Sequence, residues 1–165
     1  MVEITSLLSE NVKNHFISLP VSHQKEWVNY INEAKKEETR LKRVLKMQKS
    51  FCEKYTLERD IQIINLLEQI ININSQERNT LAEAFINTIG NSHSGVYCVE
   101  YKWAIAFLGQ MYQISQPNTP RAIALYGILN DLYYFEPIEK QGASVDNSAI
   151  KEELKELLAP FADKN

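Results

Sequence analysis

The sequence predicts an all-α fold, an irregular or orthogonal bundle of about seven to eight helices. Three observations lead to this prediction. Hydrophobic residues recur every three or four positions through most of the chain, which is the spacing of one helix face. Only five Gly and five Pro occur among 165 residues, whereas antiparallel sheets need many turns built from both. An apolar fraction of 44% and a charged fraction of 24% are typical of a globular domain that folds without a disulfide or a metal.

The first predicted helix spans residues 5–19, and Pro20 interrupts it. Its apolar face consists of Leu8, Val12, Phe16 and Leu19. Ser22 is predicted to be the N-cap of a second helix over about residues 23–36, because its hydroxyl can accept from a free N–H of the next turn. The apolar side of that helix consists of Trp27, Val28, Ile31 and Ala34.

The third predicted helix begins at or before Thr39. Its apolar stripe consists of Leu41, Val44, Leu45, Gln48, Phe51, Cys52 and Tyr55. Thr56 is predicted to cap a fourth helix, whose broad apolar surface indicates a central, buried position. That surface includes Leu57, Ile61, Ile64, Leu67, Ile70 and Ile71, with Ile63, Leu66 and Ile73 beside them. The isoleucines also alternate as in a strand, but the run is too long for a typical strand.

The second half of the chain predicts four more helices. Residues 74–77 form a capping box that opens a fifth helix, and Gly90 ends it. A sixth helix is expected over about residues 97–115, with a short strand at 96–99 as the open alternative. Together with the fourth helix, it should be the most buried.

The remaining two helices have clear boundaries. Thr119 and Pro120 predict the start of a seventh helix, which the Glu136–Pro137 pair ends. Residues 138–145 are predicted to be a linker to a last amphipathic helix. Its apolar side contains Ile150, Leu154, Leu157, Leu158 and Phe161, and its polar side contains Lys151, Glu152, Lys155 and Glu156.

Several runs between residues 6 and 51 stand at fixed spacing: Phe-Ile-Ser-Leu-Pro at 16–20, Ser-His-Gln-Lys-Glu-Trp-Val at 22–28, Tyr-Ile at 30–31, and Glu-Ala-Lys-Lys-Glu-Glu-Thr-Arg-Leu-Lys-Arg at 33–43. This stretch resembles the YdeI/OmpD-associated, or bacteriocin-protection, family. The resemblance implies a helical module linked to tolerance of bacteriocins or other envelope stress, without known catalytic residues. We predict a family-like segment over residues 1–55 and a helical region of unknown type over 56–165, packed with the first as one domain.

The charge of the chain is unevenly distributed. The formal net charge is −3, yet seven basic and two acidic residues lie between Lys35 and Lys49, a local balance of 7 − 2 = +5. We predict an interaction surface there, with a second element near the end of the seventh helix. The residues of this predicted surface are Lys35, Lys36, Thr39, Arg40, Lys42, Arg43, Lys46, Tyr133 and Tyr134. The simpler interpretation is a solvated helix face with ion pairs such as Glu38–Lys42.

Residues with catalytic potential are few and scattered. The three histidines, His15, His23 and His93, are far apart, and no metal-ligand or phosphate-loop spacing occurs. The sequence therefore predicts no cofactor, no metal site and no assigned catalytic residue. His93 and Cys98 are the best centre for an enzyme, because a thiolate beside a base can act as a nucleophile. Cys52 and Cys98 are predicted to be reduced thiols, with a disulfide between them as the alternative.

These observations favour a non-enzymatic helical module that binds an unknown protein partner. The first alternative is a nucleic-acid-associated regulatory protein that uses the Lys35–Lys49 face, and the second is an enzyme centred on His93 and Cys98. Residues 1–20 lack the apolar run of a secretory signal, and the longest apolar-rich stretch, 103–108, is far below membrane-spanning length. We therefore expect a cytoplasmic protein without membrane insertion, and leave its oligomeric state open.

Overall fold

The computed structural model describes residues 4–73, 81, 83–85, 88, 102–134, 152 and 156, the last four of 102–134 by their backbone alone. In these ranges the ordered elements are a short 3-10 helix and six α-helices, with no strand, which confirms the predicted all-α fold. The elements are η1 (Ile4–Leu7), α1 (Glu10–Ile17), α2 (Val21–Asn32), α3 (Glu37–Tyr55), α4 (Glu58–Ile71), α6 (Lys102–Ile114) and α7 (Pro120–Tyr134).

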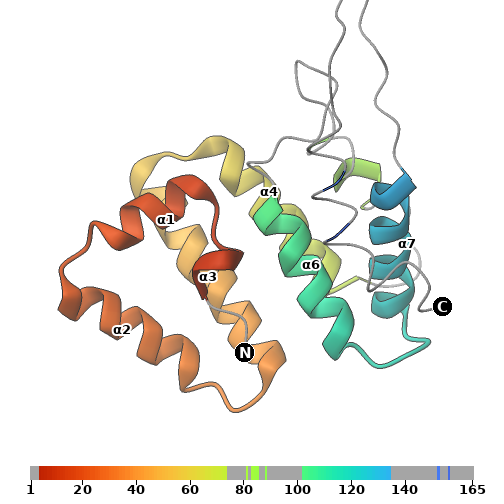
Figure 1. Cartoon of the computed structure of the whole chain (residues 1–165), viewed down its shortest axis with the longest axis horizontal. Coiled ribbons are helices and arrows are strands. Elements are labelled where there is room, and N and C mark those ends of the chain that lie inside the picture. The colour runs from red at the N-terminus through yellow and green to blue at the C-terminus, as the bar shows by residue number, and fades with distance from the viewer. Residues whose placement is uncertain are drawn as a thin grey trace, which may run out of the picture.

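Helix α3 lies between α1 and α2 on one side and α4 on the other (Figure 1). It packs against α1, α2, α4 and α6, while α6 also packs against η1, α4 and α7. Helices α1, α2 and α3 form one end of the molecule, and α6 and α7 lie toward the other. A single apolar core runs through all of these helices, from Leu7 to Leu129. The family-like segment and the helices after it therefore share one core.

Helix α6 has the largest fraction of buried residues, as predicted, with eight of its thirteen residues buried. Helix α4 buries six of fourteen residues, which is close to the eight of nineteen that α3 buries. The apolar stripe of α4 faces the core as expected. Among α1, α2, α3, α4 and α6, helix α4 has the second largest buried fraction after α6, in line with the prediction, and its margin over α3 is small.

The first predicted helix, over residues 5–19, is wrong as a single element. It is divided into η1 and α1 at Ser9, whose side-chain oxygen accepts a hydrogen bond from the Val12 N–H at 3.1 Å. Such a cap satisfies a donor that has no partner inside the helix, so it fixes the start of α1 at Glu10. The predicted apolar face persists across the break, since Leu8, Val12 and Phe16 are buried.

The predicted cap of the second helix is also wrong. Helix α2 begins at Val21, with Pro20 at the cap position and no side-chain cap, so Ser22 lies exposed in the first turn. The Pro20 carbonyl accepts from the N–H groups of His23 and Gln24 at 2.9 and 3.1 Å. The ring of a proline fixes φ at a value that suits the start of a helix, so Pro20 favours a helix beginning at Val21.

The boundary between the third and fourth helices differs from the prediction as well. Helix α3 starts at Glu37, and Thr39 lies in its first turn. Thr56 does not cap α4. It ends α3 in the left-handed conformation, at φ 57° and ψ 49°, and Leu57 takes the cap position of α4 without a side-chain hydrogen bond. This is an unusual conformation for a β-branched residue.

The later predictions are confirmed where the structure describes them. Residues 102–114 are helical, as predicted for the sixth helix. Thr119 caps α7, because its Oγ1 accepts from the Ala122 N–H at 3.2 Å. Leu81 and Phe85 are helical and buried, as expected for a fifth helix, and Glu152 and Glu156 are exposed. The predicted features at 74–77, 90, 96–99, 136–137 and 138–145, and the apolar side of the last helix, lie outside the described residues.

A buried amide at the middle of α3 ties three helices together. The Gln48 side chain is fully buried; its Oε1 accepts from the Ser9 N–H at 3.0 Å, and its Nε2 donates to the Leu7 carbonyl at 2.8 Å. The Ser9 hydroxyl also donates to Asp60 of α4 at 2.8 Å. Because buried polar groups are costly without partners, this network fixes the η1–α1 junction against α3 and α4.

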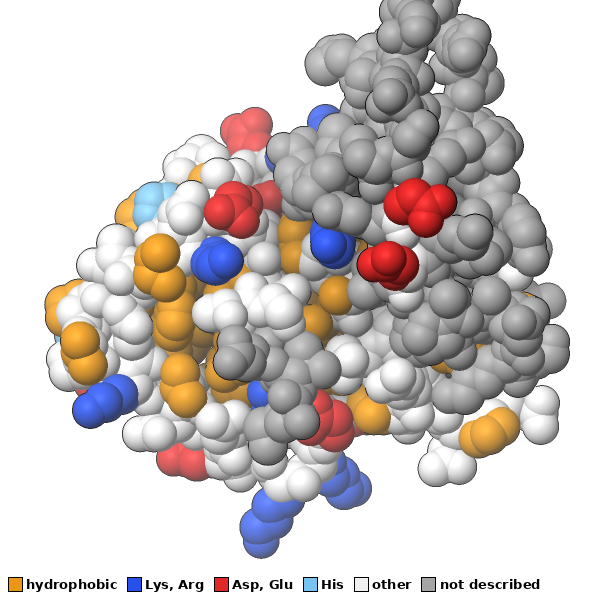
Figure 2. Space-filling view, viewed as in Figure 1, with side chains coloured by type: hydrophobic (Ala, Val, Ile, Leu, Met, Phe, Trp, Pro, Cys, Tyr) orange, Lys and Arg blue, Asp and Glu red, His pale blue; other side chains and the backbone are white. Residues whose placement is uncertain are grey.

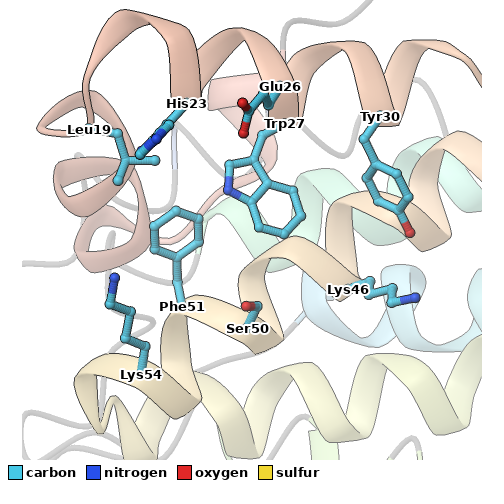
Figure 3. Close-up of a pocket in the computed structure, with 9 residues that line it drawn as sticks. All are labelled: Leu19, His23, Glu26, Trp27, Tyr30, Lys46, Ser50, Phe51 and Lys54. Carbon is cyan, nitrogen blue, oxygen red and sulfur yellow. The ribbon is translucent and has the colours of Figure 1, made fainter.

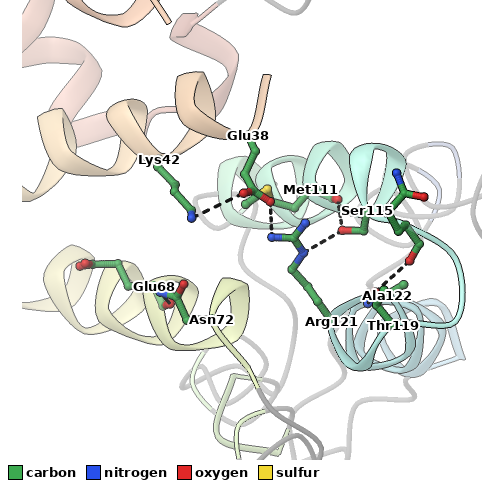
Figure 4. A network of polar contacts seen from close by, with 10 residues as sticks. Glu38, Lys42, Glu68, Asn72, Met111, Ser115, Thr119, Arg121 and Ala122 are labelled. Atoms are coloured by element: carbon green, nitrogen blue, oxygen red, sulfur yellow. Dashed lines mark hydrogen bonds and ion pairs between the residues drawn. The ribbon is translucent and has the colours of Figure 1, made fainter. Parts of the chain in front are cut away.

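An ion pair joins α3 to α7 (Figure 4). Arg121 pairs through its guanidinium with Glu38 and donates from Nε to Ser115 Oγ at 3.0 Å. Glu38 also pairs with Lys42 at 3.6 Å. The pKa of Glu38 lies below its ordinary value, chiefly because Arg121 donates a hydrogen bond to the carboxylate. Burial opposes this shift with a smaller effect, and the positive charges of Arg121 and Lys42 add to it.

We predict that Gln48→Leu strongly destabilises the fold, although the two side chains are similar in size. The Ser9 N–H and the Leu7 carbonyl would be buried without partners, at a cost of roughly 2–4 kcal/mol in the free energy of unfolding. Urea unfolding followed by circular dichroism measures this. The control is Gln62→Leu, an exposed position of α4, expected to change stability by less than about 0.5 kcal/mol. Equal stabilities of the two variants would contradict the role of Gln48.

We also predict a pH-dependent contribution from the Glu38–Arg121 pair. Because the folded pKa of Glu38 lies below the ordinary value of 4.5, its stabilisation is complete above that pH and is lost as the pH falls through the folded pKa. The Glu38 side chain is 38% exposed, so Glu38→Gln should cost less than about 1 kcal/mol at neutral pH.

Urea unfolding at a series of pH values checks this prediction. The difference between wild type and Glu38→Gln should close as the solution becomes more acidic than pH 4.5. Glu26→Gln is the control, since Glu26 is exposed and forms no ion pair among the described residues. A difference that stays constant into acid would show that the charge of Glu38 does not stabilise the fold.

Candidate functional site

A groove between α2 and α3, called the α2–α3 groove, has a volume of about 560 Å³. Helix α2 and the turn before it form one side, and α3 forms the other (Figure 3). The lining residues are Leu19, His23, Glu26, Trp27, Tyr30, Lys46, Ser50, Phe51 and Lys54. A cavity of this size lies within the range of protein ligand sites.

Aromatic side chains form the floor of the α2–α3 groove. Trp27 and Tyr30 meet edge to face with ring centroids 6.0 Å apart, and Trp27 meets Phe51 at 6.1 Å. In Figure 3, Trp27 points from α2 toward α3 and Phe51 points from α3 toward α2. Phe51 is 5% exposed, whereas Trp27 and Tyr30 are half-buried. Part of the aromatic floor is therefore open to solvent.

The aromatic floor continues into the core of the α1–α2–α3 end. Phe51 stacks with Tyr55 at 6.2 Å, and Tyr55 stacks with His15 of α1 at 3.7 Å with an interplanar angle of 4°. His15 therefore packs against the end of α3. Because such ring contacts stabilise one relative arrangement of the three helices, they hold the shape of the groove.

The rims of the groove carry exposed charged residues. Lys46 and Lys54 stand on the α3 side at opposite ends, with Ser50 between them, while His23 and Glu26 stand on the α2 side (Figure 3). Figure 2 shows hydrophobic side chains gathered on the end of the molecule formed by α1, α2 and α3, with Lys and Arg among them. The site thus joins an apolar floor to a partly cationic rim.

The predicted basic surface is largely engaged in contacts within the chain. Arg40 is only 5% exposed and donates to Glu37 at 3.0 Å, so its place on an open surface was wrong. Arg43 donates to the Tyr30 carbonyl at 2.6 Å and lies 4.8 Å from the centre of that ring. Lys42 pairs with Glu38, as the ion-paired interpretation expected.

Other members of the predicted surface are placed apart. Lys35 and Lys36 are exposed at the turn between α2 and α3, and Thr39 is half-buried in the first turn of α3. Lys46 belongs to the α2–α3 groove. Tyr133 and Tyr134 lie in the last turn of α7, and their side chains are outside the described residues. Whether these residues form one interaction surface stays a prediction.

The chemistry of the described residues is limited. Within them no group of three His, Cys, Asp or Glu side chains is placed to hold a metal ion. Cys52 is a buried free thiol. Burial, with the negative charges of Asp60 and Glu53, raises the pKa of the Cys52 thiol to about 12. His93 and Cys98 lie outside the described residues.

A second, smaller hollow of about 390 Å³ lies at the turn between α6 and α7. Its walls include Tyr112, Ser115, Asn118 and Tyr126, and none of the described residues that line it is charged. It offers fewer means of recognising a ligand than the α2–α3 groove. No helix in the described ranges is at once long enough and apolar enough to cross a membrane.

The match to a known family lies over the α2–α3 groove. Residues 3–50 match the bacteriocin-protection family described as YdeI or OmpD-associated. The resemblance predicted over residues 6–51 is thereby confirmed. The matched residues include η1, α1, α2 and most of α3, and contain seven of the nine groove residues, all except Phe51 and Lys54. Neither a search of curated proteins nor a search of solved structures found a match.

The groove was not predicted from the sequence, although all of its lining residues lie within predicted helices or next to them. Trp27 and Phe51 were assigned to apolar helix faces, which is correct but does not show that a groove lies between the two helices. The available signal was the combination of aromatic residues at 27, 30, 51 and 55 with lysines at 46 and 54. The sequence cannot show that these two helices face each other, because helix pairing depends on tertiary packing.

We predict that Cys52 is unreactive in the folded protein. The thiolate is the reactive form, and a pKa of about 12 leaves very little of it at mildly alkaline pH. A Cys98→Ser variant isolates Cys52 and can be titrated with Ellman's reagent. Labelling should be slow in the folded state and rapid after unfolding in urea. Rapid labelling of the folded variant would show that the thiol is accessible and ionised.

Proposed function

We propose that this chain is a non-enzymatic module that binds a protein partner through the α2–α3 groove. The observation that carries the proposal is the half-open aromatic floor, since Trp27 and Tyr30 stay partly exposed beside the buried Phe51. Aromatic side chains in such positions commonly dominate the binding energy of protein interfaces. The cavity and the family match coincide in the same helices, which supports the groove as the functional part of the segment.

The wider role we propose is protection against bacteriocins or other envelope stress, from the cytoplasmic side. Its support is the match of residues 3–50 to the bacteriocin-protection family. In this role the module acts by occupying a partner rather than by changing a substrate. The groove supports binding of that kind, because it combines an apolar floor with a few charged groups that can orient a bound chain.

The nucleic-acid alternative receives little support from the Lys35–Lys49 face. A surface that binds phosphates needs several free cations. Arg40 is buried, Arg43 is bonded to a backbone carbonyl, and Lys49 pairs with Glu68 at 3.2 Å. These contacts consume much of the positive charge that suggested a nucleic-acid partner.

Site-specific photo-crosslinking tests the proposed function in cells. A photo-reactive phenylalanine at His23, on the exposed rim, would capture whatever occupies the groove. Ser50→Trp blocks the groove from an exposed position without removing a core contact, and Gln62→Trp adds the same ring on exposed α4 surface. We expect one defined partner protein, with a yield about ten-fold lower in Ser50→Trp than in Gln62→Trp.

Survival under bacteriocin challenge is the second readout. Cells that produce Ser50→Trp should lose protection, whereas cells that produce Gln62→Trp should keep it. Equal crosslinking in the two variants would exclude the groove as the binding site. Crosslinks to nucleic acid that weaken steeply with salt would support the alternative role in place of this one.

A further inference from the structure

The two rims of the α2–α3 groove carry opposite charges. On the α3 side, Lys46 and Lys54 are exposed, and neither pairs with a carboxylate among the described residues. The ammonium group of Lys46 lies 6.0 Å from the centre of the Tyr30 ring, and that of Lys54 lies 5.3 Å from the centre of the Tyr55 ring. On the α2 side stands the exposed carboxylate of Glu26. An occupant is therefore favoured if it is acidic along one edge only.

The spacing of the rim residues sets the length of the occupant. Lys46 and Lys54 are eight residues apart on one helix, which corresponds to about 12 Å along its axis. His23, Glu26 and Tyr30 cover nearly the same length on α2. A bound helix that follows this groove makes contact over about two turns, with anchors at i, i+3 or i+4, and i+7. Acidic residues seven or eight positions apart on that helix would meet the two lysines.

We infer that the α2–α3 groove receives one amphipathic helix of a partner protein, with an apolar stripe on the aromatic floor and acidic residues seven or eight positions apart facing Lys46 and Lys54. This inference rests on the proposed protein-binding function and specifies the chemistry of the partner. The apolar stripe covers the exposed parts of Trp27 and Tyr30. The acidic edge faces α3, because Glu26 on the opposite rim would repel it.

Two synthetic helical peptides test the inference with the full chain. Both carry the same Leu/Phe stripe, and one has Glu where the other has Lys at the two edge positions. Binding is measured by calorimetry and by tryptophan emission, which should shift to shorter wavelength as Trp27 is covered, while Trp103 is already buried. Trp27→Phe should remove the emission shift and also weaken binding, because Trp27 is part of the aromatic floor.

We expect the Glu peptide to bind about ten-fold more tightly than the Lys peptide at low salt, because each exposed pair changes from attraction to repulsion. The Lys46→Glu/Lys54→Glu variant should reverse this preference. Lys25→Glu/Lys35→Glu is the matched control, since both lysines are exposed and neither lines the groove. It should keep the wild-type preference for the Glu peptide.

Equal binding of the two peptides, no saturable binding of the Glu peptide, or a preference unaffected by Lys46→Glu/Lys54→Glu would each overturn the inference. The crosslinking from His23 separates this failure from failure of the proposed function. If Ser50→Trp abolishes crosslinking to a partner but the Glu peptide is not preferred, only the acidic helix is overturned. If no partner is crosslinked and the Glu peptide is not preferred, the groove is overturned as a binding site.

Discussion

The described fold depends on the burial of one polar side chain in the middle of its central helix. Gln48 is completely enclosed, and it bonds to backbone groups on both sides of the junction between η1 and α1. The Ser9 hydroxyl extends the network to Asp60 of α4. Helices from both the family-like segment and the following region are thereby held to α3 by directional bonds, in addition to the non-directional attraction of the apolar core.

The α2–α3 groove exists because α2 covers its side of α3 only in part. Helix α3 packs against four other helices, and Ile31 is the sole fully enclosed side chain that α2 contributes. Trp27 and Tyr30 are consequently left partly open beside Phe51. Contacts between rings, from His15 through Tyr55 and Phe51 to Trp27, support this arrangement from below. A rigid support of this kind keeps a binding surface in shape before the partner arrives.

Much of the fold was predictable from the sequence, since the spacing of apolar residues reports which side of each helix is buried. The α6 core and the Thr119 cap of α7 follow from local signals. The cap at Ser9 is a local signal, but its bonds to Gln48 and Asp60 were not predictable, because these partners are 39 and 51 residues away. The α2–α3 groove and the burial of Arg40 were missed for the same reason. Both depend on which helices meet, and the spacing of residues along the sequence does not show that.

The position at which the family match ends has a consequence for how this segment could be inherited or transplanted. The match ends at residue 50, within α3, whereas the Ser9 network continues to Asp60 and the groove to Lys54. A fragment cut there would lack Phe51 and Lys54 of its cavity and would leave the Ser9 hydroxyl without its acceptor. A protein that receives this segment by recombination must therefore supply equivalents of Asp60 and of the last residues of α3. The unit that can be exchanged between proteins thus extends beyond the residues that match the family.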